Sequence, residues 1–169
     1  MPTMTTLLSD DPDDQVVRQN THPSDWQNPT AQSRYDLVVI GGGTAGLVSA
    51  GGAALAGAKV ALVERDLMGG DCLATGCVPS KGIIRAARAA AEVRDSHRFG
   101  VRCTGINVDF AAAMTQMRRA RAVISQHDAV RRFSDEYGVD VFLGDGRFAA
   151  PDAVDVGGGA EGQRGHVEL

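Results

Sequence analysis

The stretch Tyr35-Asp36-Leu37-Val38-Val39-Ile40-Gly41-Gly42-Gly43-Thr44-Ala45-Gly46 decides the fold. Its first half predicts a buried parallel strand, because consecutive apolar side chains leave neither face of the strand polar. The glycines predict a turn, and the small residues 47–56 predict a helix that ends near Gly57. Residues 59–63 predict a second buried strand. The sequence therefore predicts a compact βαβ unit within an α/β fold that contains a parallel sheet.

The glycine turn also matches the pattern GxGxxG, which by itself is weak evidence for nucleotide binding. Here the pattern follows a predicted strand, opens a predicted helix, and is followed by an acid, Glu64, at the end of the next strand. Gly41 allows the tight turn, Gly43 lets the backbone approach a pyrophosphate, and Gly46 permits close packing of helix on strand. The helix N-terminus offers free N–H groups to phosphates, and Glu64 can accept hydrogen bonds from a ribose. The predicted dinucleotide-binding residues are Gly41, Gly43, Thr44, Ala45, Gly46 and Glu64, with a purely structural turn as the alternative.

Two cysteines follow in residues 69–81, GGDCLATGCVPSK, where Cys72 and Cys77 lie five positions apart. In a regular helix their Cα atoms would be roughly 8.6 Å apart, whereas a disulfide needs about 4.4–6.8 Å. If the two cysteines pair, the backbone between them must leave the helix, and Gly76 supplies the freedom to do so. Pro79 loosens the same turn, because it has no N–H to donate.

The helical pattern after these cysteines places them at the N-terminal end of a helix, where the dipole favours a thiolate. Lys81 adds positive charge nearby. Two inert buried cysteines are an alternative interpretation. A zinc site is a weaker one, because only Cys103 remains as a third thiol and the spacing is unusual for zinc.

Composition excludes several classes of protein. The chain is 43% hydrophobic and 22% charged, as is typical of a soluble globular protein. No apolar run approaches the roughly 18–20 residues that span a membrane, and no secretory signal opens the chain, so the expected compartment is the cytoplasm. A disulfide there is more often catalytic than structural. Five acids and one base in residues 1–33 account for the net charge of −4, so the balanced remainder gives no reason to expect a nucleic-acid partner.

Further elements are predicted on both sides of this unit. Residues 1–33 are polar and rich in proline, which predicts a disordered or extended arm without a core of its own, with Trp26 as the candidate to pin it onto the domain. A helix after the cysteines would turn Ile83, Ile84, Ala87 and Ala91 inward, and a second helix over about 109–136 would turn Phe110, Met114, Met117 and Ile124 inward. Strands are expected at 139–143, 147–148, 154–156 and 166–169, with a loop at the glycine run 157–159.

The glycine pattern followed by GGDCLATGCVPSK resembles the pyridine nucleotide–disulfide oxidoreductases, a family that includes glutathione reductase, dihydrolipoamide dehydrogenase and mercuric reductase. The resemblance covers about residues 35–156. It implies that residues 34–169 form part of a Rossmann-like FAD-binding domain and that Cys72 and Cys77 form a redox-active disulfide. By the same resemblance, Cys77 faces the flavin and Cys72 attacks the substrate. Three further cofactor-binding residues follow from it: Lys81 beside the flavin ring, Gly70 near the pyrophosphate, and Gly146 in a turn near the adenine.

The implied function is an oxidoreductase that passes electrons from NAD(P)H through FAD to the dithiol and on to a small molecule, a metal ion or a disulfide. Residues 68–72 and 22–26 are similar to those of mercuric reductases and related FAD oxidoreductases. No second GxGxxG with its own βαβ unit follows, and no His–Glu motif of the family's dimerisation domain is present. The chain is therefore expected to be an N-terminal fragment, incomplete at its C-terminus and without turnover of its own, of a protein that is homodimeric at full length. The alternative is a flavin- or nucleotide-binding module without reductase activity.

Overall fold

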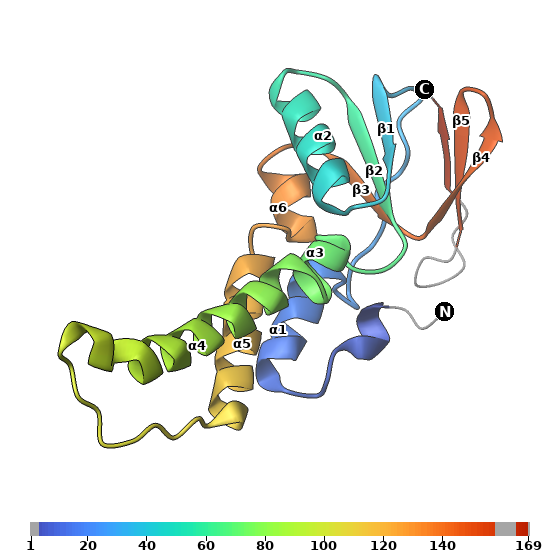
Figure 1. The fold of residues 1–169 in the computed structure, drawn as a ribbon. Coiled ribbons are helices and arrows are strands. Elements are labelled where there is room, and N and C mark those ends of the chain that lie inside the picture. Colours follow the sequence, from blue (N-terminus) through green and yellow to red (C-terminus); the bar gives the residue numbers. More distant parts are fainter. Residues whose placement is uncertain (1–3, 158–164, 169) are drawn as a thin grey trace.

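A three-stranded parallel sheet forms the centre of the molecule, as predicted. The structure is a computed structural model that describes residues 4–157 and 165–168. The sheet has the order β1-β2-β3, with β1 (Leu37–Ile40), β2 (Val60–Glu64) and β3 (Asp140–Leu143). Every residue of the central strand β2 is buried, and helix α2 (Thr44–Leu55) covers one face (Figure 1). The α/β fold with a parallel sheet is thereby confirmed.

A second sheet packs against the first. It is antiparallel, with the order β4-β5-β6, and consists of β4 (Asp145–Ala150), β5 (Ala153–Gly157) and β6 (Gly165–Glu168). The core between the two sheets contains Tyr35, Ala61, Val63, Phe142, Val156 and Val167. The predicted short strands are confirmed up to Glu168, while Leu169 of the last strand and Gly158 and Gly159 of the predicted loop lie outside the described residues.

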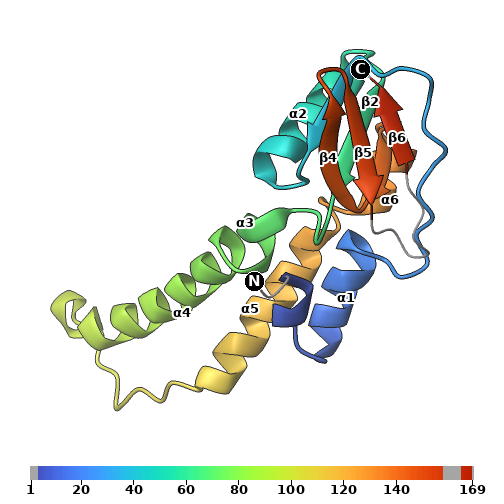
Figure 2. The same ribbon diagram turned by 90° about the vertical axis from the view of Figure 1, so that its right-hand side faces the viewer.

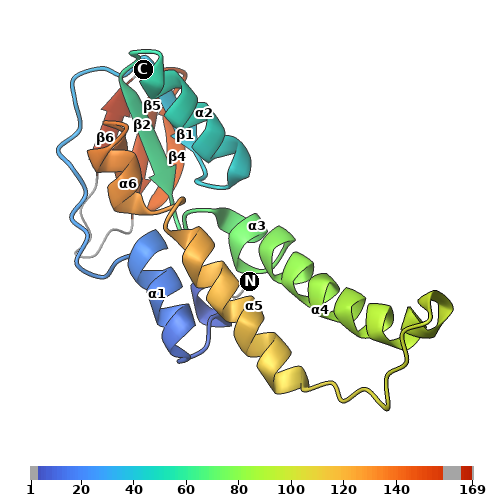
Figure 3. The same cartoon turned by 90° about the vertical axis from the view of Figure 1, so that its left-hand side faces the viewer.

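Helices α4 and α5 extend away from the sheets (Figures 1 and 3). The elements between β2 and β3 are α3 (Gly70–Ala74), α4 (Cys77–Asp95), the 3-10 turn η2 (Ser96–Phe99), α5 (Phe110–Ser125) and α6 (Val130–Asp135). The prediction of one helix over 109–136 is wrong, because the extended backbone of Ala129 separates α5 from α6. This break lets Val130 and Phe133 reach the core beneath the parallel sheet.

The predicted inward faces of α4 and α5 are only partly confirmed. Met117 is buried, but Phe110 is 67% exposed and Ile84 56% exposed, and Ile83 and Ile124 are also exposed. Figure 1 shows that α4 and α5 both project from the body of the molecule and diverge from each other. Helix α5 packs against both α4 and α1, while apolar side chains such as Ile84 on α4 and Phe110 at the far end of α5 stay exposed.

The prediction of a disordered or extended N-terminal arm is wrong for residues 4–21. Residues Met4–Leu7 form the 3-10 turn η1 and Pro12–Thr21 form helix α1, which lies alongside α5 (Figure 2). Asp11 caps the helix by accepting a hydrogen bond from the Asp13 N–H at 2.9 Å. The segment folds because it joins a core that other elements supply: Val17 is fully buried with residues of α3 and α5.

Residues beyond α1 run along the outer edge of the parallel sheet. Trp26 donates from Nε1 to the Val141 carbonyl at 3.2 Å, as expected for a residue that pins this segment to the domain. The Asn28 amide pairs twice with Leu143: its Nδ2 donates to the carbonyl at 3.0 Å and its Oδ1 accepts from the N–H at 2.8 Å. These side chains occupy backbone groups of β3 that a further strand would otherwise use.

Among the described helices, none combines the length and the apolar character that crossing a membrane requires.

Candidate functional site

The glycine loop between β1 and α2 has the geometry that its sequence predicts. Gly41 has a φ of +103°, a conformation that favours glycine. A Cβ at Gly46 would lie 1.8 Å from the Gly41 carbonyl oxygen, so this position admits only glycine. A Cβ at Gly43 would meet nothing within 4 Å, and no side chain caps the helix that begins after it. The loop thus leaves open space in front of a helix N-terminus, which suits a phosphate.

Glu64 lies at the end of β2 and holds this loop in place. Its Oε2 accepts a hydrogen bond from the Gly42 N–H at 2.5 Å, and its Oε1 accepts one from the Asp66 N–H at 2.7 Å. The side chain is buried. Its observed role is to tie the glycine loop to the loop that leads into the cysteine segment, while ribose recognition by the same carboxylate remains a prediction.

The cysteine segment is built directly onto the glycine loop. The Gly69 N–H donates to the Gly42 carbonyl at 2.7 Å, and Gly43 and Gly69 form an isolated parallel bridge. A Cβ at Gly70 would lie 2.9 Å from the Gly43 Cα, and Gly70 has a φ of +55°. Close backbone approach therefore requires glycine at position 70, and the two motifs form one structural unit.

The backbone between the two cysteines leaves the helix, as predicted. Helix α3 ends at Ala74, and α4 begins with Cys77 as its first residue. The N–H groups of Thr75 and Gly76 both donate to the Asp71 carbonyl, at 3.0 and 2.7 Å. A Cβ at Gly76 would lie 3.0 Å from the same oxygen, which explains the glycine between the helices.

Cys72 and Cys77 are free thiols in the structure and interact with each other. Interaction with the Cys77 thiol lowers the pKa of Cys72. The Thr44 hydroxyl, the Cys77 N–H and the charge of Lys81 act in the same direction. The pKa of Cys77 is raised, because its thiol is the donor to the Cys72 sulfur. Cys72 is thus the thiol that ionises first and the better candidate for the attacking nucleophile.

The other predicted residues lie at the same carboxyl edge of the sheet. Lys81, one turn into α4, is exposed and close enough for its charge to favour thiolate at both cysteines. Gly146 on β4 packs against Val63 and Ile40, where a Cβ would lie 3.0 Å and 3.4 Å from their side chains. Ligands of open α/β sheets bind at this carboxyl edge. The structure therefore gathers the predicted residues around one edge.

One further residue next to this unit has no signal in the sequence. The Asp128 carboxylate, between α5 and α6, lies 2.6 Å from the position that a Cβ would take on Gly69. Burial raises its pKa, while the charges of His127 and Arg132 partly oppose that change. Sequence alone could not place Asp128 beside Gly69, because the contact depends on where α5 ends.

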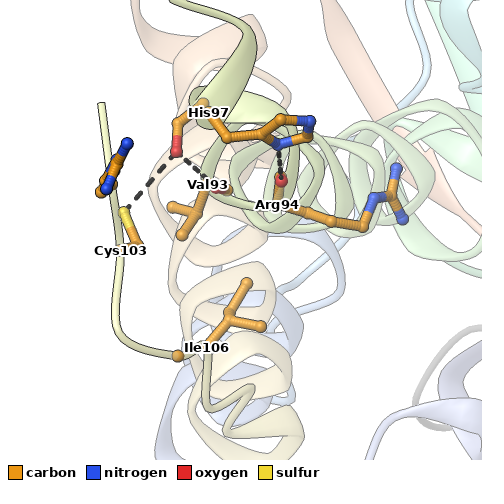
Figure 4. A pocket seen from close by; sticks show the side chains of 8 residues that line it. Val93, Arg94, His97, Cys103 and Ile106 are labelled. Atoms are coloured by element: carbon orange, nitrogen blue, oxygen red, sulfur yellow. Dashed lines mark hydrogen bonds between the residues drawn. The ribbon is translucent and has the colours of Figure 1, made fainter. Parts of the chain in front are cut away.

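The third cysteine, Cys103, lies far from the dithiol, near the far end of α4. Cys103 lines a hollow of about 450 Å³ at the far end of α4, with its sulfur 3.6 Å from the Ser96 hydroxyl (Figure 4). His97 lies in the same hollow and contacts the Arg94 carbonyl through Nδ1 at 3.1 Å. Within residues 4–157 and 165–168, no three His, Cys, Asp or Glu side chains gather so that they could hold a metal ion.

Comparison with known proteins agrees with this geometry. The chain is 37% identical over 119 residues to a dihydrolipoyl dehydrogenase of Bacillus subtilis, covering 70% of this chain and 25% of the relative. It is 34% identical over 127 residues to a mercuric reductase of Lysinibacillus sphaericus, covering 75% and 23%. The chain thus spans about a quarter of the length of these curated relatives.

The fold also matches a solved structure, the Cu(II) complex of the HOCl-induced flavoprotein disulfide reductase RclA from Escherichia coli. The TM-score is 0.60 and the identity 24%, over 81% of this chain and 27% of that one, a likeness that shows the fold. The family model of the pyridine nucleotide-disulphide oxidoreductases matches residues 35–166. This match covers both the glycine loop and the dithiol, and it shows that the chain belongs to the pyridine nucleotide-disulphide oxidoreductase family.

Proposed function

We propose that this chain is the FAD- and dithiol-bearing part of an oxidoreductase that passes electrons from NAD(P)H through FAD to Cys72 and Cys77. The final acceptor is a disulfide or a mercuric ion. The observation that carries the proposal is the contact between the two motifs: the Gly43–Gly69 bridge and the hydrogen bond from the Gly69 N–H to the Gly42 carbonyl hold the cysteine segment against the glycine loop. A cofactor seated on that loop would lie next to the thiols.

The residues present fit FAD. Gly43 leaves open space and α2 has an uncapped N-terminus, which together suit a pyrophosphate. Glu64 accepts one hydrogen bond on each carboxylate oxygen, which leaves lone pairs for a ribose hydroxyl. FAD, when bound, supplies the two electrons that reduce the disulfide. Lys81 would add positive charge beside the flavin ring, which is electron-rich when reduced.

The dithiol itself suits reduction of a disulfide. Because Cys72 has the lowered pKa, its thiolate attacks one substrate sulfur and releases the other half of the substrate as a thiolate. The Cys77 thiol, already directed at the Cys72 sulfur, then loses its proton, attacks that sulfur and releases the second half. The substrate gains two electrons, and the dithiol loses two in forming the Cys72–Cys77 bond.

Thiol chemistry and cofactor retention test the proposal together. Mild oxidation of the purified chain should remove two thiols and yield one peptide pair linked through Cys72 and Cys77 by mass spectrometry, whereas exposed Cys103 serves as the unlinked control. In equilibrium dialysis the unaltered chain should retain FAD, and the Gly43→Val variant should not. FAD retention without a Cys72–Cys77 link would instead identify a flavin-binding module without reductase activity.

We also propose that these 169 residues do not turn over by themselves, because the sequence has no second GxGxxG with its own predicted βαβ unit and no His–Glu motif of the family. Steady NADPH consumption by the purified chain would contradict this. The proposed whole protein is a homodimer. Its proposed compartment is the cytoplasm, where a disulfide is more often catalytic than structural.

A further inference from the structure

The N-terminal segment lies outside the residues that the family model matches, yet it contacts the dithiol loop. The family match begins at residue 35. We define the N-terminal clamp as residues 4–22, which comprise η1, α1 and the turn after it. In Figures 2 and 3 helix α1 of this segment lies beside α5, and η1 contacts α3.

Apolar side chains of the clamp cover the residues that follow each cysteine. Leu8 and Val17 form a buried cluster with Leu73 and Ala74, the two residues after Cys72. Val78, the residue after Cys77, packs against the same cluster. The backbone next to both sulfurs is therefore supported from the N-terminal side.

A buried ion pair fixes the end of α3. Arg121 of α5 donates from Nη1 to the Ala74 carbonyl at 2.6 Å, and its Nη2 pairs with Asp14 of the clamp. Asp14 also accepts hydrogen bonds from the N–H and hydroxyl of Ser9, at 2.9 and 2.7 Å. Arg121 is only 7% exposed, and its Nε has no partner. A buried cation in this state depends on Asp14 and Ala74 remaining in place.

The clamp also holds the loop that leads into α3. The Asp66 carboxylate accepts hydrogen bonds from the N–H groups of Met4 and Thr5, and the Asp66 carbonyl contacts His22. The Met68 N–H donates to the Thr21 carbonyl at 3.2 Å. Both ends of the α3 segment are thus tied to residues 4–22.

We propose that the N-terminal clamp sets the position of Cys72 and that Arg121 is the positioning residue through which it acts. Helix α3 has five residues, too few to be stable without outside contacts. The Ala74 carbonyl, two residues after Cys72, is held by Arg121, so release of this bond frees the segment that carries the sulfur. The inference rests on the proposed function in that the dithiol must be able to oxidise.

An equilibrium with glutathione tests the role of Arg121 in the full chain carrying Cys103→Ser. In this reaction the Cys72 and Cys77 thiols and one glutathione disulfide give the protein disulfide and two glutathione thiols. Arg121→Met should lower the equilibrium constant roughly tenfold, because a loosened α3 reduces the effective concentration of one thiol at the other. Arg118→Met is the matched control, since Arg118 lies on the same helix and pairs with Asp11 of the clamp at 4.0 Å. It should leave the constant unchanged.

Two further variants distinguish positioning from general stability. A uniform loss of stability changes the melting temperature but not this constant, which compares two folded states. Asp14→Asn keeps the size of the side chain and should lower the constant by about threefold even if Arg121→Met does not fold. Arg121→Lys should restore part of the loss. If Arg121→Met or Asp14→Asn has the same equilibrium constant as Arg118→Met, the proposed role of the N-terminal clamp is wrong. If the Cys103→Ser chain does not form the Cys72–Cys77 disulfide at all, the proposed function is wrong instead.

Discussion

The two ends of α4 share one helix but not one environment. At its base, Cys77 interacts with Cys72 of α3, and Val78 packs against apolar residues of α3, α5 and the N-terminal clamp. At its far end, Phe99 is 84% exposed, and Phe110 at the nearby start of α5 is exposed as well. The base therefore combines contacts from segments far apart in sequence, while the far end depends on neighbours in the chain. Along α4, buried contacts are therefore concentrated at the base, next to Cys77.

The largest difference in the free energy of unfolding is expected when one methyl group is added to the glycine loop near the base of α4 or to the loop beyond its far end. Gly46→Ala places a Cβ 1.8 Å from the Gly41 carbonyl oxygen, so the loop must move, and we expect a loss of about 3 kcal/mol in the free energy of unfolding. Gly105→Ala, in the loop beyond the far end of α4, meets nothing within 4 Å and should cost less than about 0.5 kcal/mol. Urea unfolding measures both. A similar loss in the two variants would erase the contrast between base and far end.

A smaller difference is expected for apolar side chains. Leu73→Ala removes a side chain buried between α3 and the clamp and should cost about 2 kcal/mol, the lower end for buried leucines because its cluster is small. Ile84→Ala, on the exposed face of α4, should cost less than about 1 kcal/mol. Thermal unfolding of both variants gives the comparison. Equal losses would mean that another part of the protein covers the face of α4 that carries Ile84.

The smallest effect concerns the acidity of the thiol. The Thr44 hydroxyl lowers the pKa of Cys72 by stabilising its thiolate, so Thr44→Val should raise that pKa and shift the alkylation profile of Cys72 to higher pH. At neutral pH the rate should fall about threefold, as expected for one hydrogen bond of roughly 0.7 kcal/mol. Thr115→Val, which removes a hydroxyl bonded to the Ala111 carbonyl at 3.1 Å on α5, is the control. An unchanged profile in Thr44→Val would show that the glycine loop does not tune the dithiol.

The sequence predicted the parts of the fold that short-range patterns specify. Glycines with fixed spacing, the apolar strand before them and the break between the cysteines all follow from local geometry, and the structure contains them. Residues 1–33 were predicted without structure because their composition is polar, yet Val17 is buried in a core whose other members lie on α3 and α5. No local pattern reveals a core that one segment shares with distant ones.

The same limit explains what the site prediction omitted. Arg121 resembles its neighbours Arg118 and Arg119 in sequence, but only the fold shows that its guanidinium is buried against Asp14 and Ala74. The exposure of Ile84 and Phe110 has the opposite cause: helical periodicity predicts an apolar face, but it does not state whether anything packs on that face.

The Asn28 side chain has a consequence for how this protein behaves in a crowded solution. By pairing with both backbone groups of Leu143, it fills a place where a strand from a neighbouring molecule could add to the sheet. A chain shortened past Asn28 would expose that docking register and would be expected to self-associate into insoluble material, even though every residue of the dithiol remained.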